Sequence, residues 1–293
     1  MLYLFNTKRG TRKYIEEFGK GHTQKFFDFA ETKGPEFYNQ HWPMWNGKFI
    51  DDDVEVCFQG IIRGTKRLQM ACETNNVPYY YFDQPYLFYN EYQPHPGFGQ
   101  PWYRIIKNNV QMIDINERHR ERFEYVKGMC TDKDTLNQMT LKDWKKDGQT
   151  ILVIPPSEHT ATWYDIEVKS WIQNIKAEIR KHTDRPIQVR YKYVNRKHGK
   201  RNSTPLSVEL KNCFAMVSWH SMAACEAVIA GVPSFTSEHS PANRVSYSLN
   251  DLDKIEQPLY SDLRERWLWS LIGNQFMLSE ITTDYAYKYI NGE

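Results

Sequence analysis

Apolar residues in the first half of the chain fall into short runs separated by helical and polar segments. The runs VEVCF (54–58) and VPYYYF (77–82) are continuous and rich in β-branched and aromatic residues, which is typical of buried strands. Between them, a loop, QGIIRGT, leads into KRLQMACETNN (66–76), which has the pattern of a helix. The pattern therefore predicts a strand–helix–strand unit.

A similar alternation appears in the second half. TILVI (150–154) is predicted to be a strand, PPSEHTATW (155–163) a loop, and 164–181 a helix. PIQVRY (186–191) and CFAMVSW (213–219) are predicted to be the next strands. The predicted helix places one set of apolar residues on a single face: Val168, Trp171, Ile172, Ile175 and Ile179.

Strands that alternate with helices indicate parallel sheets, so the sequence predicts an α/β protein of two domains with a cleft between them. The polar segment 127–149 is interpreted as the linker. We expect domains at 1–130 and 149–262. The aromatic-rich stretch 262–281 is predicted to be helical with an interruption near Gly273, and we expect residues 263–293 to cross back to the first domain.

Composition narrows the class of protein. Among 293 residues, 38 Lys and Arg nearly balance 36 Asp and Glu, so any polyanion must be bound by local patches. The five cysteines are an odd number and are scattered along the sequence without close pairing, which favours reduced thiols in a cytoplasmic protein. The start MLYLFNTKRG is too short an apolar run for a signal peptide, and no segment approaches the ~20 apolar residues of a membrane span. We therefore expect a soluble protein without a membrane partner.

The sequence offers no local metal-binding motif. No two of the nine histidines have the HxH or HxxxH spacing of zinc ligands. His119 has Glu117 and Glu121 nearby, but in a helix these carboxylates point to another face, which favours a solvated charged helix. The aspartates at 51–53 precede a strand instead of following one, which disfavours a metal-bridging role. We expect no tightly bound metal.

The stretch NCFAMVSWHSMAACEAVIAGVPSF (212–235) carries the strongest chemical signal. A helix that starts directly after a strand offers backbone N–H groups that attract phosphate. Ser221 is a candidate N-cap, Ala223 allows close approach of a ligand, and Glu226 could accept hydrogen bonds from ribose hydroxyls. The alternative is an ordinary strand–helix turn without a ligand.

This order of strand, polar hinge, small-residue helix with an internal Glu, and Gly-Val-Pro resembles the donor-binding segment of GT-B glycosyltransferases. The resemblance covers about 150–281 and implies two facing Rossmann-like domains, with the acceptor in 1–130 and a nucleotide sugar, with a UDP-sugar favoured, in 149–262. By position, the resemblance implies these donor-binding residues: Ser157, His159, Arg190, Lys192, Trp219, His220, Ser221, Met222, Ala223 and Glu226.

A second motif lies in the first half, where YYYFDQPYLF (79–88) precedes PWYRIIKNNVQ (101–111). Asp83 follows a predicted strand, so it is a candidate general base for an acceptor hydroxyl, and the alternative is a turn-capping Asp. Arg104 and Lys107 lie a turn apart if their segment is helical, and could contact phosphates or be ordinary surface residues. The two stretches resemble bacteriophage glycosyltransferase-like proteins linked to modified DNA bases.

Local basic runs at 7–13, 63–67 and 190–202 favour a nucleic-acid acceptor, although each run alone is also typical of a solvated loop. The expected acceptor is a hydroxymethylated pyrimidine, such as 5-hydroxymethylcytosine, in duplex phage DNA within the host cytoplasm. The alternatives are a nucleotide-sugar epimerase, a surface-glycan glycosyltransferase, and a non-catalytic nucleic-acid-binding protein. The residues expected to contact DNA are Arg63, Arg104, Lys107, Arg196, Lys197, Lys200 and Arg201.

Overall fold

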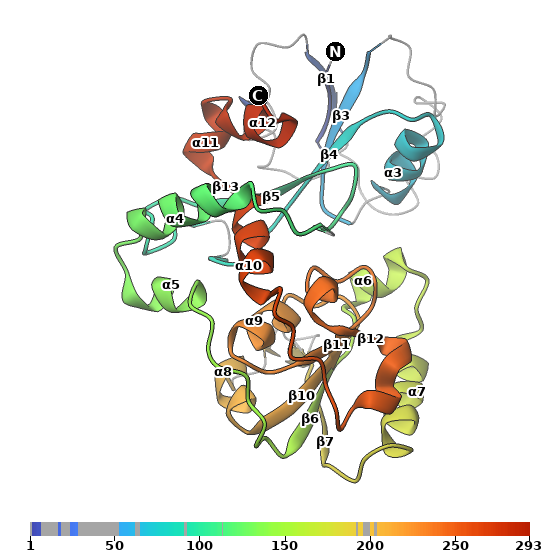
Figure 1. The fold of residues 1–293 in the computed structure, drawn as a ribbon. Coiled ribbons are helices and arrows are strands. Elements are labelled where there is room, and N and C mark those ends of the chain that lie inside the picture. The colour runs from blue at the N-terminus through green and yellow to red at the C-terminus, as the bar shows by residue number, and fades with distance from the viewer. Residues whose placement is uncertain are drawn as a thin grey trace. The chain divides into compact units, whose positions relative to one another are not determined.

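The computed structural model is an α/β structure that divides into two compact units, Met1–Val110 with Ile272–Glu293, and Gln111–Leu271 (Figure 1). It describes residues 2–6, 17–18, 24–28, 53–61, 65–90, 93–112, 114–191, 193–195, 200–201 and 204–293. Each unit is built on its own, mainly parallel, sheet. The domain limits expected from the sequence stay a prediction.

The sheet of the first unit has the strand order β13-β5-β4-β3-β1-β2. Strands β2, β1, β3 and β4 are parallel, whereas β5 and β13 are antiparallel to their neighbours. Helix α3 (Thr65–Thr74) connects β3 to β4, which confirms the predicted strand–helix–strand unit. The strands are β1 (Leu2–Asn6), β2 (Gln24–Asp28), β3 (Glu55–Gln59), β4 (Tyr79–Asp83), β5 (Trp102–Lys107) and β13 (Gln275–Met277).

Aromatic side chains form much of the core of this unit. The ring of Phe18 packs edge-on against those of Tyr80 and Phe82, with centroids 5.0 and 4.9 Å away. The C-terminal helices α11 (Leu278–Thr282) and α12 (Tyr285–Asn291) contribute buried residues to the same core. The hydroxyl of Tyr287 donates to Glu55 at 2.7 Å, so the end of the chain is tied to β3 by a polar contact as well.

The sheet of the second unit is entirely parallel, in the order β12-β11-β10-β6-β7. Its strands are β6 (Thr150–Ile154), β7 (Ile187–Val189), β10 (Cys213–Ser218), β11 (Ser234–Thr236) and β12 (Tyr247–Ser248). The predicted strands at 150–154, 186–191 and 213–219 are confirmed. Strand β10 is buried along its whole length, as expected for a strand covered on both faces.

The remaining elements of the second unit connect and cover these strands. They are α4 (His119–Met129), α5 (Lys133–Gln138), α6 (Glu158–Trp163), α7 (Val168–Arg180), α8 (Leu206–Glu209) and α9 (Ala223–Ile229). Short 3-10 helices span η2 (Leu210–Asn212), η3 (Asn243–Val245) and η4 (Leu249–Lys254). Strand β8 (Tyr193–Asn195) pairs with β9 (Lys200–Arg201) in a separate antiparallel ribbon. The chain leaves this unit within helix α10 (Arg264–Gly273). No helix in the described ranges is long and apolar enough to cross a membrane.

Three expectations about local structure were wrong. Residues 158–163 form α6 instead of a loop, because Ser157 caps the helix by accepting the N–H of Thr160 at 3.2 Å. The predicted helix at 164–181 begins only at Val168, where Glu167 provides the cap. The expected interruption near Gly273 is confirmed, but Gln275–Met277 form strand β13 instead of helix before α11 begins at Leu278.

Candidate functional site

Strand order places the candidate site at the carboxyl ends of β6 and β10. In the second sheet, β7 follows β6 on one side while β10, β11 and β12 extend on the other, so the winding reverses between β6 and β10. Loops that leave two adjacent parallel strands in opposite directions open a crevice, and doubly wound sheets bind ligands there. The residues that follow Ile154 and Ser218 therefore form the candidate site.

Four ring side chains gather at this edge, and we call them the aromatic cluster: Tyr164, Trp219, His220 and His239. Tyr164 stacks on His239 with ring centroids 4.5 Å apart and lies 5.7 Å from His220. The rings come from three loops, which follow α6, β10 and β11. Such a group of flat rings is suited to stacking against a base or a sugar.

Hydrogen bonds hold two of these loops in place. The carbonyl of Trp219 accepts two hydrogen bonds from Ser237, one from its backbone N–H at 3.2 Å and one from its side-chain hydroxyl at 2.5 Å. These bonds join the loop after β10 to the loop after β11. His220 is buried, and its Nε2 lies 2.7 Å from the side-chain nitrogen of Gln111. The site is thus braced by a residue that is distant from it in sequence.

The start of helix α9 differs from the expectation of exposed backbone N–H groups. The N–H of Ala223 is bonded to Oγ of Ser221 at 3.2 Å, and the N–H of Ala224 to the carbonyl of Ser221 at 3.0 Å. The next two N–H groups bond to the carbonyl of Met222, which is the N-cap and makes no side-chain cap. Because α9 has only seven residues and these amides are bonded within the turn, side chains must supply most of any phosphate contact.

Two charged residues flank this turn. Arg190 is ion-paired with Glu209, and its Nη2 donates to the carbonyl of Thr204 at 2.9 Å. Glu226 keeps exposed surface, yet the surrounding protein displaces water from its carboxyl and raises the pKa, an effect that the charge of Arg190 partly offsets. This edge of the sheet therefore carries one cation, Arg190, whose charge is balanced by Glu209, and one carboxyl, Glu226, whose pKa is raised.

The other residues expected to bind the donor have simpler settings. Ser157 caps α6 and lies 2.9 Å from the hydroxyl of Thr160, while His159 is exposed in the first turn of that helix. Lys192 lies outside the described residues. Sequence reasoning missed Tyr164, His239 and Gln111. Tyr164 follows the short helix α6 and His239 follows strand β11, and these positions could have indicated both residues. No local sequence signal identifies Gln111.

In the first unit, Asp83 and Arg104 form an internal ion pair at 2.7 Å. Arg104 is buried; burial lowers its pKa, but Asp83 and neighbouring tyrosines raise it more strongly, so the net shift is upward. The segment of Arg104 is strand β5, not a helix. Lys107, at the end of β5, donates to Oδ1 of Asn291 at 2.5 Å and lies 3.9 Å from Glu55. Both cations thus have partners inside their own unit.

The basic residues expected to contact DNA fall largely outside the described part of the chain. Arg63, Arg196 and Lys197 are not described, and Lys200 and Arg201 are described only as backbone in β9. Within the described ranges, no group of three or more His, Cys, Asp or Glu side chains is arranged to hold a metal ion.

Comparisons with known proteins give distant structural similarity. Two KpsC structures of Thermosulfurimonas dismutans, a β-Kdo 2,7 transferase and a β-Kdo 2,4 transferase, match with TM-scores of 0.48 and 0.46 and identities of 12% and 8%. They cover 98% and 97% of this chain, and the same shares of their own chains. A UDP co-structure of S. aureus MnaA matches with a TM-score of 0.30 and 11% identity, over 92% of this chain and 90% of that chain. No protein-family model matches the chain, and no curated protein is significantly similar in sequence.

Proposed function

We propose that the protein is a glycosyltransferase that moves a sugar from a nucleotide-sugar donor, with a UDP-sugar favoured, to a hydroxyl acceptor. One observation carries the proposal. The segment 212–235, whose sequence resembles a donor-binding segment, forms β10, α9 and β11 at the edge where the winding of the second sheet reverses. A nucleotide sugar has the size and mixed polarity that such an edge accommodates.

The residues at this edge suit the parts of a nucleotide sugar. The aromatic cluster offers rings for stacking against the base or the sugar. The hydroxyls of Ser157 and Ser221, with the imidazole of His159, supply donors for the diphosphate, whose charge grows as it departs. In this proposal Glu226 accepts hydrogen bonds from the ribose hydroxyls, and the two units face one another as GT-B domains. Asp83, the candidate base of the acceptor domain, is ion-paired with Arg104, so its catalytic role is put to a separate test.

The proposed acceptor is a hydroxymethylated pyrimidine in phage DNA. Its support is the set of basic runs in the sequence and the resemblance of 79–88 and 101–111 to phage proteins that modify DNA bases. A base inside a duplex must leave the stack to reach an enzyme site, which costs free energy. The affinity that comes from phosphate contacts should fall as the salt concentration rises.

Calorimetry with UDP tests the donor site directly. Ser221→Leu removes a hydroxyl and inserts a bulky group beside Ala223, so UDP affinity should fall about tenfold or more. Ser207→Leu is the matched control, because Ser207 is exposed on α8. Unchanged UDP affinity in Ser221→Leu, in a protein that unfolds at the wild-type temperature, would remove the donor-site assignment.

Turnover distinguishes the acceptors. Release of UDP from several UDP-sugars is measured alone, with hydroxymethylated duplex DNA, with unmodified duplex DNA, and with oligosaccharides. Stimulation by hydroxymethylated DNA alone is the expected result. Stimulation by an oligosaccharide would replace the DNA acceptor with a glycan, and interconversion of UDP-sugars without an acceptor would indicate an epimerase.

A further inference from the structure

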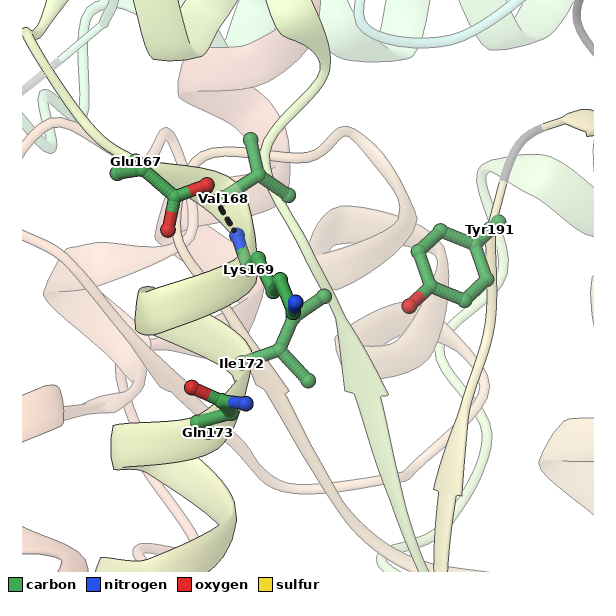
Figure 2. A pocket seen from close by; sticks show the side chains of 6 residues that line it. All are labelled: Glu167, Val168, Lys169, Ile172, Gln173 and Tyr191. Carbon is green, nitrogen blue, oxygen red and sulfur yellow. Dashed lines mark hydrogen bonds between the residues drawn. The ribbon is translucent and has the colours of Figure 1, made fainter.

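A pocket separate from the aromatic cluster lies between the start of helix α7 and the end of strand β7. It has a volume of about 310 Å³ and is lined by Glu167, Val168, Lys169, Ile172, Gln173 and Tyr191. Figure 2 shows Tyr191 on one side and the α7 residues on the other. None of these residues belongs to the donor site proposed above, so the pocket requires its own interpretation.

The walls of the pocket are apolar and include one flat surface. Tyr191 is 50% exposed, which is unusual for a large ring, and it faces the side of α7 that carries Ile172 (Figure 2). Val168 and Ile172 are partly buried and add aliphatic surface. An exposed tyrosine ring opposite branched aliphatic groups is suited to a small ring with an apolar face.

The rim of the pocket disfavours an anionic ligand. Glu167 caps α7, and its two carboxylate oxygens accept the N–H groups of Lys169 at 3.0 Å and Ser170 at 2.6 Å. The side chain of Ser170, followed by these two backbone N–H groups, lowers the pKa of Glu167 and favours its carboxylate form. A phosphate at this helix start would meet a negative charge and find these two amides already used.

The same rim offers hydrogen-bonding groups of both kinds. Glu167 accepts, the ammonium group of Lys169 donates, and the amide of Gln173 does both. Among the residues that the structure describes, none forms a hydrogen bond with the side chain of Gln173 or the hydroxyl of Tyr191. One negative and one positive group balance each other, so the rim matches an uncharged ligand that carries several hydroxyls.

From these features we propose that the pocket binds one neutral sugar ring of a glycan. The apolar C–H face of the ring stacks on Tyr191, and its hydroxyls reach Glu167, Lys169 and Gln173. The volume lies at the low end of the roughly 300–1,000 Å³ range of small-molecule sites, which fits a single ring. Such a site would hold a glycan on the donor-binding unit, outside the donor site, and it does not depend on the proposed transfer reaction.

Ligand-observed NMR saturation transfer on the full chain tests this inference. The probes are the methyl β-glycosides of glucose, galactose and N-acetylglucosamine, with uridine and inorganic phosphate for comparison. At least one glycoside should bind, and Tyr191→Ala should weaken that binding about tenfold because the stacking surface is lost. Tyr191→Phe keeps the ring and should bind nearly as well as the wild type. Tyr125→Ala is the matched control, because Tyr125 is 58% exposed on α4.

Each result decides the inference. Binding of no glycoside, or equal binding by Tyr191→Ala and Tyr125→Ala, would overturn it. Loss of uridine binding in Tyr191→Ala, without glycoside binding, would make the pocket a nucleobase site and also overturn it. UDP affinity, measured by calorimetry in the same variants, should not change. That measurement separates this pocket from the donor site, whose failure would appear instead in Ser221→Leu.

Discussion

Oδ2 of Asp83 lies 2.7 Å from Nη2 of Arg104, and the hydroxyl of Tyr81 donates to the same oxygen at 2.5 Å. The other oxygen, Oδ1, accepts the N–H of Gln84 at 2.8 Å. Both oxygens of the carboxylate that the sequence puts forward as a general base are therefore hydrogen-bonded inside the first unit. A base needs a lone pair directed at the acceptor hydroxyl, so this geometry favours a structural role.

Replacing Asp83 separates these roles. Asp83→Asn leaves Arg104 buried without its counter-charge, so the free energy of unfolding should fall on the order of 2–3 kcal/mol. We expect less than the ~3–5 kcal/mol typical of fully buried pairs, because 22% of the Asp83 side chain is exposed. Urea unfolding measures the loss, and turnover per folded molecule should stay near the wild-type value. Asp262→Asn, at an exposed position, is the control.

A different result would restore the catalytic assignment. Turnover reduced by about 10²-fold or more, with unfolding as in Asp262→Asn, would show that Asp83 removes a proton in spite of its partners. The two measurements need the same preparation, because partial unfolding alone also lowers apparent turnover.

The central strands were predictable because their signal is local. The runs at 54–58, 150–154 and 213–219 are continuous and apolar, and they become the fully covered middle of each sheet. Strand β13 could not be found this way. Its residues Gln275–Met277 follow a helix directly and become a strand through pairing with β5, which lies about 170 positions earlier in the chain. Such pairing is a tertiary effect that no sequence window contains.

The backbone conformation at position 231 is expected to require glycine. The φ of Gly231 is +81°, and a Cβ there would lie 2.0 Å from the carbonyl oxygen of Asp143. Gly231→Ala should reduce the free energy of unfolding by about 2 kcal/mol or more, because the left-handed backbone and the close contact both oppose a side chain. Urea unfolding at one pH provides the measurement.

Gly128→Ala is the matched control for that variant. Gly128 lies in α4, and a Cβ there would have open space around it. Alanine should stabilise the helix by about 0.5–1 kcal/mol. The same substitution is thus expected to have opposite signs at the two positions, and an equal effect at both would refute the role given to Gly231.

The sequence could predict only those residues of the candidate site that come directly after a recognisable strand. Ser221 and Glu226 could be placed at the edge of the second sheet because they follow a clear strand. Gln111, which contacts His220, is 109 positions away from it in sequence. The polarity of the segment before β6 predicts a linker, yet Lys142 and Lys145 donate their backbone N–H groups to the carbonyls of Ile229 and Gly231. Polarity indicates surface exposure, but it does not show whether backbone groups are engaged.

Gln111 is expected to orient His220. Gln111→Leu removes the hydrogen bond and leaves a buried polar group with one partner fewer, so the imidazole should lose its fixed orientation. UDP affinity by calorimetry should fall about five- to tenfold. Gln111→Glu keeps a hydrogen-bonding group in place and should bind UDP more tightly than Gln111→Leu. Gln257→Leu, at an exposed position, should match the wild type. Equal UDP affinity in all four proteins would show that Gln111 does not act on the site.

His119 should make the stability of the second unit depend on pH. Burial, followed by the charges of Arg118 and Arg122, lowers the pKa of this histidine from 6.5 to about 4. Between these values the unfolded chain binds a proton that the folded protein does not, so stability rises with pH across that window. The contribution is complete above about pH 6.5 and is lost as the pH falls towards 4. Over the whole window it amounts to a few kcal/mol.

His119→Gln removes the titrating group and tests this dependence. Urea unfolding at pH 4.5, 5.5, 6.5 and 7.5 gives the free energy of unfolding of the variant and the wild type. The wild type should gain on the variant as the pH rises to 6.5, and the difference should then level off. His182→Gln, which replaces a partly exposed imidazole beside Glu178, is the control. A difference between wild type and His119→Gln that is the same at all four pH values would mean that His119 does not change its protonation on unfolding, and that its burial alone contributes to stability.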